Sequence, residues 1–329
     1  MKLVGLDLEG PVFRPGLDMA RLTVERLWDR GLRELRGALV RFDAWDDRWY
    51  LRERRGRGLR HSTGTTPLVA SLGASGSGAT VDHFLRVARR MERNPGALSL
   101  VRGLAEGRTL VLLTSGAPAL GLSLAREAGL PFSRTFTHGL PPARGRAPLR
   151  AEAARRWPRA LEDSALKEFV RDYLALVPPL SAPAGGARFR ESASALARSL
   201  PPGPRAWVAR LLLSEGGVMG GHGKLRALCR FGRPDVAIGD SIVDAEMVGG
   251  AKWGIALNCT SPPTLAAARW HAATTEVERL PEVVDALERG RDPRELRGPD
   301  LRLFDAKEYR RGPRKVLAIH RKFKRMLTV

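Results

Sequence analysis

Residues 2–10 read KLVGLDLEG, an apolar run that ends in two carboxylates and a glycine. Because a Gly-Pro pair stops the run, residues 2–8 predict a short buried strand with acids at its C-terminal end. Residues 235–244, DVAIGDSIVD, show the same order of strand, turn and acid. Two such units, with helical patterns between them, predict an α/β fold built on a mostly parallel sheet that is covered on both faces.

Other segments continue this alternation. We predict further strands over residues 109–113, 135–137 and 254–257. Helical patterns cover residues 81–93, 96–106, 161–176 and 244–248, a stretch that ends near 128 and another that starts near 223. An Arg/Trp-rich stretch and a Pro/Ala/Arg-rich stretch interrupt the alternation, at residues 17–60 and 141–204. We therefore expect a core of residues 1–13, 95–140 and 216–290, a cap insertion at 14–94, a second insertion at 141–215, and a basic C-terminal extension at 291–329.

Composition narrows the class of protein. A chain of 329 residues exceeds one hydrophobic core, so accessory units are expected. Its 56 Lys and Arg against 35 Asp and Glu give a net charge of +21, which attracts anionic partners. The arginines are spread along the whole chain, so a compositional bias explains most of this excess and nucleic-acid binding is not favoured. Only eight of the cations are lysines, so a lysine at a chemically important position is informative.

Several other classes of protein find little support. No apolar run approaches the roughly 20 residues of a transmembrane helix, and residues 1–8 lack the features of a secretory signal. Cys229 and Cys259 form no disulfide framework, which suits a reducing cytoplasm. The six histidines have no zinc-site spacing, and the glycine-rich run at 73–78 lacks the lysine of a phosphate-binding P-loop. We expect a cytoplasmic protein, and the sequence leaves its oligomeric state open.

Three predicted strands end in polar clusters, at the edge where parallel sheets bind their ligands. The clusters are Asp7-Leu8-Glu9, Thr114-Ser115-Gly116 and Gly239-Asp240-Ser241-Ile242-Val243-Asp244. A fourth element, Lys224, opens a predicted helix. Taken alone, each of these elements could equally be a turn former, a helix cap or a solvated cation. Together and in this order they favour one site that contains carboxylate, hydroxyl and ammonium groups.

These four elements resemble the four motifs of the haloacid dehalogenase (HAD) superfamily: a DxD-like start, a strand-end Ser/Thr, an isolated Lys and a GDSxxD signature. The resemblance covers the core and implies a Rossmann-like parallel sheet with helical cap insertions. The DLEG start is similar to the phosphoserine phosphatase-like branch. The longer form DLEGP is more loosely similar to archaeal HAD proteins that are hydrogenase-associated subunits.

The resemblance implies a role for each residue. The implied Mg²⁺ ligands are Asp7, Asp240, Asp244 through a water, and the backbone carbonyl of Glu9. The implied phosphate-binding groups are Thr114, Ser115 and Lys224. The implied catalytic groups are Asp7 as nucleophile, Glu9 as general acid and base, and Lys224 as a neutralising charge. Such a set suits the chemistry, because a phosphomonoester dianion repels a carboxylate nucleophile unless cations and hydrogen-bond donors offset the charge.

Three functions remain open. The resemblance favours a Mg²⁺-dependent phosphatase that acts on a small anionic phosphorylated substrate through an aspartyl-phosphate intermediate. Family phosphatases usually carry Asp where this chain has Glu9, so phosphoryl transfer to a second hydroxyl is an alternative to hydrolysis. The third reading is a non-catalytic HAD-fold subunit or binding module.

The basic tail, residues 305–329, carries nine Lys or Arg against two acids, with six large apolar residues partly at helical spacing. We expect one amphipathic helix that packs on the core and stabilises it, while the chemistry proceeds without it. Binding to RNA or to an anionic membrane is the alternative.

The first insertion contains an aromatic set interleaved with arginines: Trp28, Trp45, Trp49 and Tyr50. We expect these rings to form the core of the cap, and stacking on a ring-containing ligand is the alternative. Five arginines follow this aromatic set: Arg52, Arg54, Arg55, Arg57 and Arg60. They either form a run of solvated charges or bind a second anionic group of the substrate.

Overall fold

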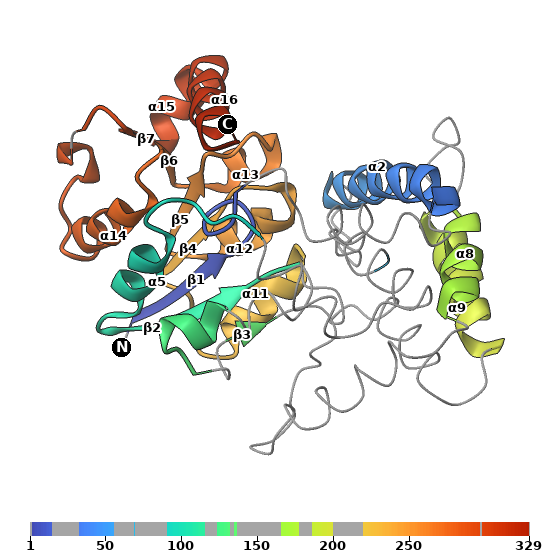
Figure 1. Ribbon diagram of the computed structural model, residues 1–329. Helices are drawn as coiled ribbons and strands as arrows, with labels where there is room; N and C mark the ends of the chain where they lie inside the picture. Colours follow the sequence, from blue (N-terminus) through green and yellow to red (C-terminus); the bar gives the residue numbers. More distant parts are fainter. Residues whose placement is uncertain are drawn as a thin grey trace.

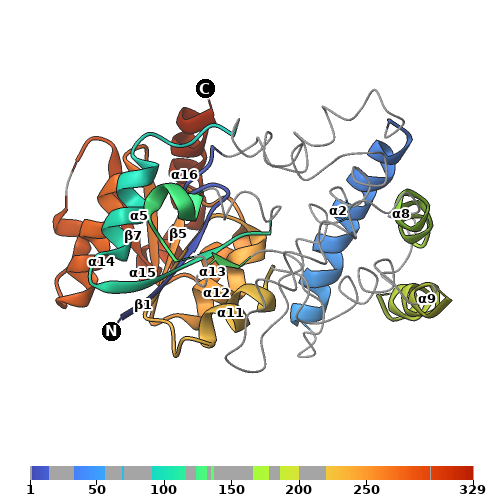
Figure 2. The same ribbon diagram turned by 60° about the horizontal axis from the view of Figure 1, so that its bottom comes forward.

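The computed structural model describes residues 2–14, 33–55, 69, 91–115, 124–131, 135–136, 166–177, 186–199, 220–296 and 298–328. These residues form a central sheet with helices on both faces, and a group of three helices lies beside it (Figure 1, Figure 2). Within these ranges, no helix combines the length and the apolar character that crossing a membrane requires.

One sheet runs through the described core, in the strand order β3-β2-β1-β4-β5-β6-β7. Its strands from β3 to β6 are parallel, and β7 is antiparallel to β6. The bounds are β1 Lys2–Asp7, β2 Arg108–Leu113, β3 Thr135–Phe136, β4 Val236–Gly239, β5 Trp253–Leu257, β6 Trp270–Thr274 and β7 Leu301–Asp305. The predicted mostly parallel α/β sheet is confirmed, and its arrangement is Rossmann-like.

Helices cover both faces because side chains alternate along the strands. Val4 and Leu6 of β1 face the hydrophobic core that includes α5 (Ala97–Ala105) and α14 (Leu280–Glu288), whereas Leu3 faces α11 (His222–Cys229) and α12 (Ala245–Gly250). The remaining core helices and 3-10 turns are η3 Ile242–Asp244, α13 Pro262–Ala267, η4 Val277–Arg279, η5 Pro293–Glu295, α15 Ala306–Arg311 and α16 Pro313–Thr328.

The group beside the sheet consists of α2 (Arg33–Arg55), α8 (Leu166–Ala175) and α9 (Gly186–Ser199) (Figure 1). Its centre is a cluster of buried rings: Phe42, Trp45, Trp49, Tyr173 and Phe189. The Tyr50 hydroxyl donates a hydrogen bond of 2.9 Å to Glu246 at the start of α12, so α2 is tied to the core. The prediction that the rings form the core of the cap is confirmed for Trp45 and Trp49, whereas the buried Tyr50 contacts Glu246 of α12, and Trp28 lies outside the described residues. Of the five arginines, only the Arg52 side chain is described, and it is exposed.

Two predicted boundaries are wrong. The helix predicted over 81–93 does not reach its expected end. Arg93 pairs with Phe13 in an isolated β-bridge, and the backbone N–H of Asn94 donates to the carbonyl oxygen of Val12. Residues 81–90 lie outside the described ranges. The predicted extension 291–329 is not separate from the core, because β7 pairs with all five residues of β6 and forms the edge of the sheet.

The tail is also two helices and not one. Gly312 ends α15, and Pro313 begins α16, where a missing backbone N–H is tolerated. The expected packing of the tail on the core is confirmed, since Val316, His320, Phe323 and Leu327 are buried.

Candidate active site

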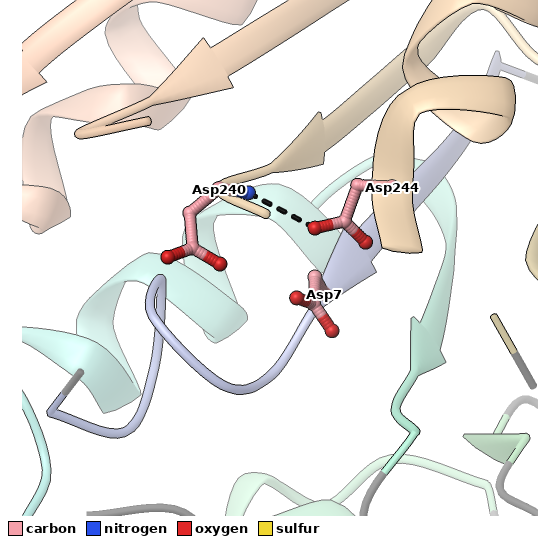
Figure 3. Close-up of side chains that lie close together, drawn as sticks. All are labelled: Asp7, Asp240 and Asp244. Carbon is pink, nitrogen blue, oxygen red and sulfur yellow. Dashed lines mark hydrogen bonds between the residues drawn. The ribbon is translucent and has the colours of Figure 1, made fainter. Parts of the chain in front are cut away.

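Three aspartates meet at the carboxyl edge of the sheet (Figure 3). Asp7 is the last residue of β1, Asp240 follows β4, and Asp244 ends the 3-10 turn η3. Their strands are direct neighbours, so one carboxylate oxygen from each aspartate lies within 4.8 Å of the other two. All three residues are buried. The sequence prediction that these aspartates gather is therefore confirmed.

Lys224 enters this cluster from α11 and is fully buried. Its Nζ donates to Oδ1 of Asp7 at 2.7 Å and to Oδ1 of Asp244 at 2.6 Å. Burial lowers the pKa of Lys224, but the Asp244 and Asp7 carboxylates outweigh that effect and hold the pKa above its ordinary value. The ammonium group therefore stays charged and bridges two acids from different parts of the chain.

Asp244 is fixed by the turn that precedes it. Its Oδ2 accepts hydrogen bonds from the backbone N–H of Asp240 at 3.1 Å, from that of Ser241 at 3.0 Å, and from the Ser241 hydroxyl at 3.0 Å. A Cβ on Gly239 would overlap the Asp244 side chain, so the approach requires glycine. Because Oδ1 of Asp244 accepts from Lys224 and its Oδ2 accepts from the turn, Asp244 links Lys224 to the loop that carries Asp240.

The Asp7 carboxylate is anchored on one side. Its Oδ1 accepts from the Leu8 backbone N–H at 2.8 Å as well as from Lys224. Within the described residues, Oδ2 of Asp7 accepts no hydrogen bond. Burial raises the pKa of Asp7 well above its ordinary value, and the Asp244 and Asp240 charges raise it further, against the lowering effect of Lys224. A second cation would stabilise the ionised form of Asp7.

Asp240 has a cation partner that the sequence analysis missed. Its Oδ2 accepts a hydrogen bond of 2.8 Å from Nζ of Lys324, near the end of α16. α16 therefore brings a charge into the candidate site, a contact that the sequence analysis did not predict. That the chemistry proceeds without the tail stays a prediction. The rarity of lysine offers a signal, but the tail holds three other lysines and helical spacing alone does not select Lys324.

The loop after β1 packs against Asp240. Gly10 has φ of +105°, and a Cβ there would overlap the Asp240 carboxyl group. Nδ2 of the buried Asn94 donates to the carbonyl oxygens of Gly10 and Pro11, at 2.7 and 3.0 Å. Asn94 therefore holds the loop in place, and no motif in the sequence singled it out.

The hydroxyl groups after β2 lie at the same edge. Thr114 and Ser115 are buried, and the Thr114 hydroxyl donates to Oε2 of Glu9 at 3.4 Å, a long hydrogen bond. Glu9 is half-buried, and its backbone pairs with Phe13 in an isolated bridge. All seven predicted site residues thus come from the carboxyl ends of β1, β2 and β4, from the turn η3 that follows β4, and from α11.

The donor set indicates which ligands would fit. Three buried carboxylates and two lysines, Lys224 and Lys324, leave one net negative charge before Glu9 is counted. Oxygen-only donors suit a hard divalent cation, and nitrogen or sulfur donors are absent from the three-residue cluster. A cation there would take up the charge that burial disfavours on Asp7.

Fold and site together define an α/β protein with a buried acidic cluster at the carboxyl edge of a parallel sheet. No family model matches the chain, and no curated protein matches it. Among solved structures, the chain is similar to gene product AF1437 from Archaeoglobus fulgidus, with a TM-score of 0.67 and 18% sequence identity. The similarity covers 99% of this chain and 97% of that one. At this identity the likeness shows the fold alone.

Proposed function

We propose that this chain is a Mg²⁺-dependent phosphatase of the HAD type, with Asp7 as its covalent nucleophile. One observation carries the proposal: Lys224 bridges Asp7 and Asp244, while an oxygen of Asp240 lies within 4.8 Å of both carboxylates. Burying charge costs free energy even when the charges are paired, and concentrations of buried ionisable groups are typical of functional sites.

The metal would be held by Asp7 and Asp240 directly, by Asp244 through a water, and by the backbone carbonyl of Glu9. When bound, Mg²⁺ would supply positive charge between the nucleophile and the phosphoryl group. The Thr114 hydroxyl, the Ser115 amide and the Lys224 ammonium would hold the phosphoryl oxygens. The substrate would be a small anionic phosphomonoester.

The chemistry divides into two displacements. An oxygen of Asp7 attacks phosphorus, the ester P–O bond breaks, and Glu9 gives its proton to the leaving alkoxide. Glu9 then takes a proton from water, whose oxygen attacks the aspartyl-phosphate and releases inorganic phosphate. In the alternative reaction, a second hydroxyl takes the place of water, and the product is a new phosphoester.

A phosphate-release assay tests the proposal. The wild-type chain should release phosphate from p-nitrophenyl phosphate or from a panel of phosphorylated metabolites only when a divalent cation is present. Asp7→Asn should abolish release, because the amide cannot form the aspartyl-phosphate. Asp172→Asn, the same change at an exposed position on α8, is the matched control and should retain full activity. Unchanged activity in Asp7→Asn would eliminate the proposal.

One observation favours a second function, that of a non-catalytic binding module. Lys224 and Lys324 already pair with the three carboxylates, so the cluster can be held together by the chain alone. Absence of Mg²⁺ binding, together with absence of phosphate release across the panel, would favour this second function.

A further inference from the structure

Lys324 connects the C-terminal helix to the candidate cation site. Its Nζ lies 2.8 Å from Oδ2 of Asp240, whose side chain is only 7% exposed, while the Lys324 side chain is 26% exposed. The lysine comes from the last two turns of α16, some 84 residues along the chain from its partner. Through this ion pair α16 contacts the aspartate cluster.

The position of Lys324 is fixed by the packing of α16. The buried residues Val316, His320, Phe323 and Leu327 recur at helical spacing along one face of the helix. Nδ1 of His320 accepts a hydrogen bond of 2.9 Å from the Cys259 backbone N–H, next to β5. Lys324 follows His320 by four residues, so it projects from the same face one turn later. A docked α16 therefore delivers the ammonium group to Asp240.

The pairing bears on cation binding. The Asp240 carboxylate can pair with the ammonium group of Lys324 or bind a divalent cation. The two cations repel each other when both lie next to this carboxylate. Lys324 compensates the charge of the buried Asp240 carboxylate when no metal is bound, so a divalent cation at this carboxylate must compete with the lysine. Lys324 thus pairs with Asp240 as Lys224 pairs with Asp7 and Asp244.

We propose that Lys324 is a positioning residue that occupies Asp240 and weakens the affinity of the aspartate cluster for divalent cations, so that cation binding and docking of α16 oppose each other. The inference rests on the cation site of the proposed function. Because coupling is reciprocal, a cation that displaces Lys324 must loosen α16 by the same free energy by which α16 weakens the cation.

Titration of the full-length chain with Mn²⁺ tests the inference, with free Mn²⁺ measured by electron paramagnetic resonance. Lys324→Met should lower the dissociation constant for Mn²⁺ by about tenfold or more, because it removes a charge next to a ligand. Lys324→Arg keeps the charge and should stay within about twofold of wild type. Lys322→Met removes an exposed cation from the same helix and should also match wild type. Asp240→Asn, added to Lys324→Met, should abolish the gain.

The outcomes separate the inference from the function on which it rests. If wild type binds Mn²⁺ and Lys324→Met binds it no more tightly, the inference is wrong while the cation site stands. If neither chain binds Mn²⁺ at millimolar concentration, both are wrong. Lys324→Gln serves as a second neutral variant if circular dichroism shows that Lys324→Met is unfolded.

Hydrogen exchange supplies a second readout, which reports on α16 itself and not on the affinity for the cation. In wild type, saturation with Mg²⁺ should speed exchange of the backbone amides of α16, and in Lys324→Met it should have no such effect. Slower exchange in α16 of the wild type on adding Mg²⁺ would overturn the proposed opposition.

Discussion

At the scale of single residues, the candidate site depends on a buried lysine between two buried carboxylates. Removing one partner of a buried ion pair leaves the others without compensation, which costs about 3–5 kcal/mol. We therefore predict that Lys224→Met lowers the free energy of unfolding by about that amount at pH 7 in the absence of divalent cations. Urea denaturation followed by circular dichroism measures this change.

The control for that prediction is Lys252→Met, because Lys252 is exposed and lies over the Trp253 ring, 3.9 Å from its centroid. It should change stability by no more than about 1 kcal/mol. Equal effects of the two substitutions would show that the Lys224 charge does not stabilise the aspartate cluster.

Glycine at position 10 is required for two separable reasons. Gly10 has φ of +105°, and a Cβ there would overlap the Asp240 carboxyl group, whereas Gly107 has φ of +65° with open space around it. Gly107→Ala should therefore cost only the backbone term, about 1–2 kcal/mol. Gly10→Ala should cost more and should also weaken binding of Mn²⁺, because Asp240 must move. Thermal unfolding of both variants gives the comparison, and equal losses would rule out the steric contribution.

Some of these residues could be predicted from the sequence and others could not. Asp7, Asp240 and Asp244 follow apolar strands in short motifs, so local spacing alone places them at one edge of a sheet. Asn94 and Lys324 act through contacts across 84 residues of chain. Their positions depend on how a loop and a helix pack, which single-sequence patterns do not encode.

At the scale of elements, the strands and helices that surround the motifs were predicted well. The predicted strands 109–113 and 254–257 match β2 and β5 within one residue at each end, and the predicted helix 96–106 matches α5. In each of these segments an apolar pattern, bounded by glycine, polar or charged residues, coincides with the element. The second helix of the 141–215 insertion, α9, was not predicted, since its sequence is rich in Ala, Ser and Arg.

The sheet edge was missed for a different reason. The sequence of β6 is WHAAT, whose small and polar residues do not give the apolar pattern of a buried strand. The sequence of β7 is LRLFD, a short alternating run inside a basic segment. β7 pairs antiparallel with β6 and forms the edge of the sheet, and α14 lies in the connection between the two strands. The basic charge of residues 291–329 predicted a separate extension. The pairing of β7 with β6 instead makes part of this segment an edge of the sheet.

The C-terminal helix offers a test at this scale. Phe323 is 5% exposed and belongs to the buried face of α16, whereas Met326 is 49% exposed. Phe323→Ala should destabilise the protein by about 3–5 kcal/mol through lost burial and the cavity left behind. Met326→Ala, on the same helix, should stay within about 0.5 kcal/mol of wild type. Similar urea midpoints for the two variants would mean that α16 contributes little to the folded state.

At the scale of the whole molecule, the C-terminal helix joins the edge of the sheet to its centre. Beneath it, His271 of β6 stacks on Tyr309 of α15 with ring centroids 4.7 Å apart, and its ring lies 6.0 Å from that of His320. Both histidines are fully buried. Two imidazole rings at one packed interface connect the stability of the whole fold to pH.

The direction of that dependence follows from the pKa values of the two histidines. Burial lowers the pKa of His271 to about 4, against an opposing effect of Asp305. Burial, with His271 and Lys324 nearby, lowers the pKa of His320 to about 3. Both values lie below the ordinary 6.5, so the unfolded chain binds more protons than the folded chain between pH 6.5 and about 4. Their contribution to stability is fully present above pH 6.5 and is lost as the pH falls through this window.

We therefore predict that replacing His271 by Phe, which keeps an aromatic ring against Tyr309, reduces the acid sensitivity of the fold. Asp7 and Asp240 have raised pKa values and change stability in the opposite sense, so a pH profile of wild type alone mixes the two effects. The difference between wild type and His271→Phe isolates the imidazole, because the carboxylates are common to both. Between pH 7 and 4.5, wild type should lose about 2 kcal/mol more than the variant. Urea denaturation across this range measures the difference, and parallel profiles for the two proteins would show that folding does not lower the pKa of His271.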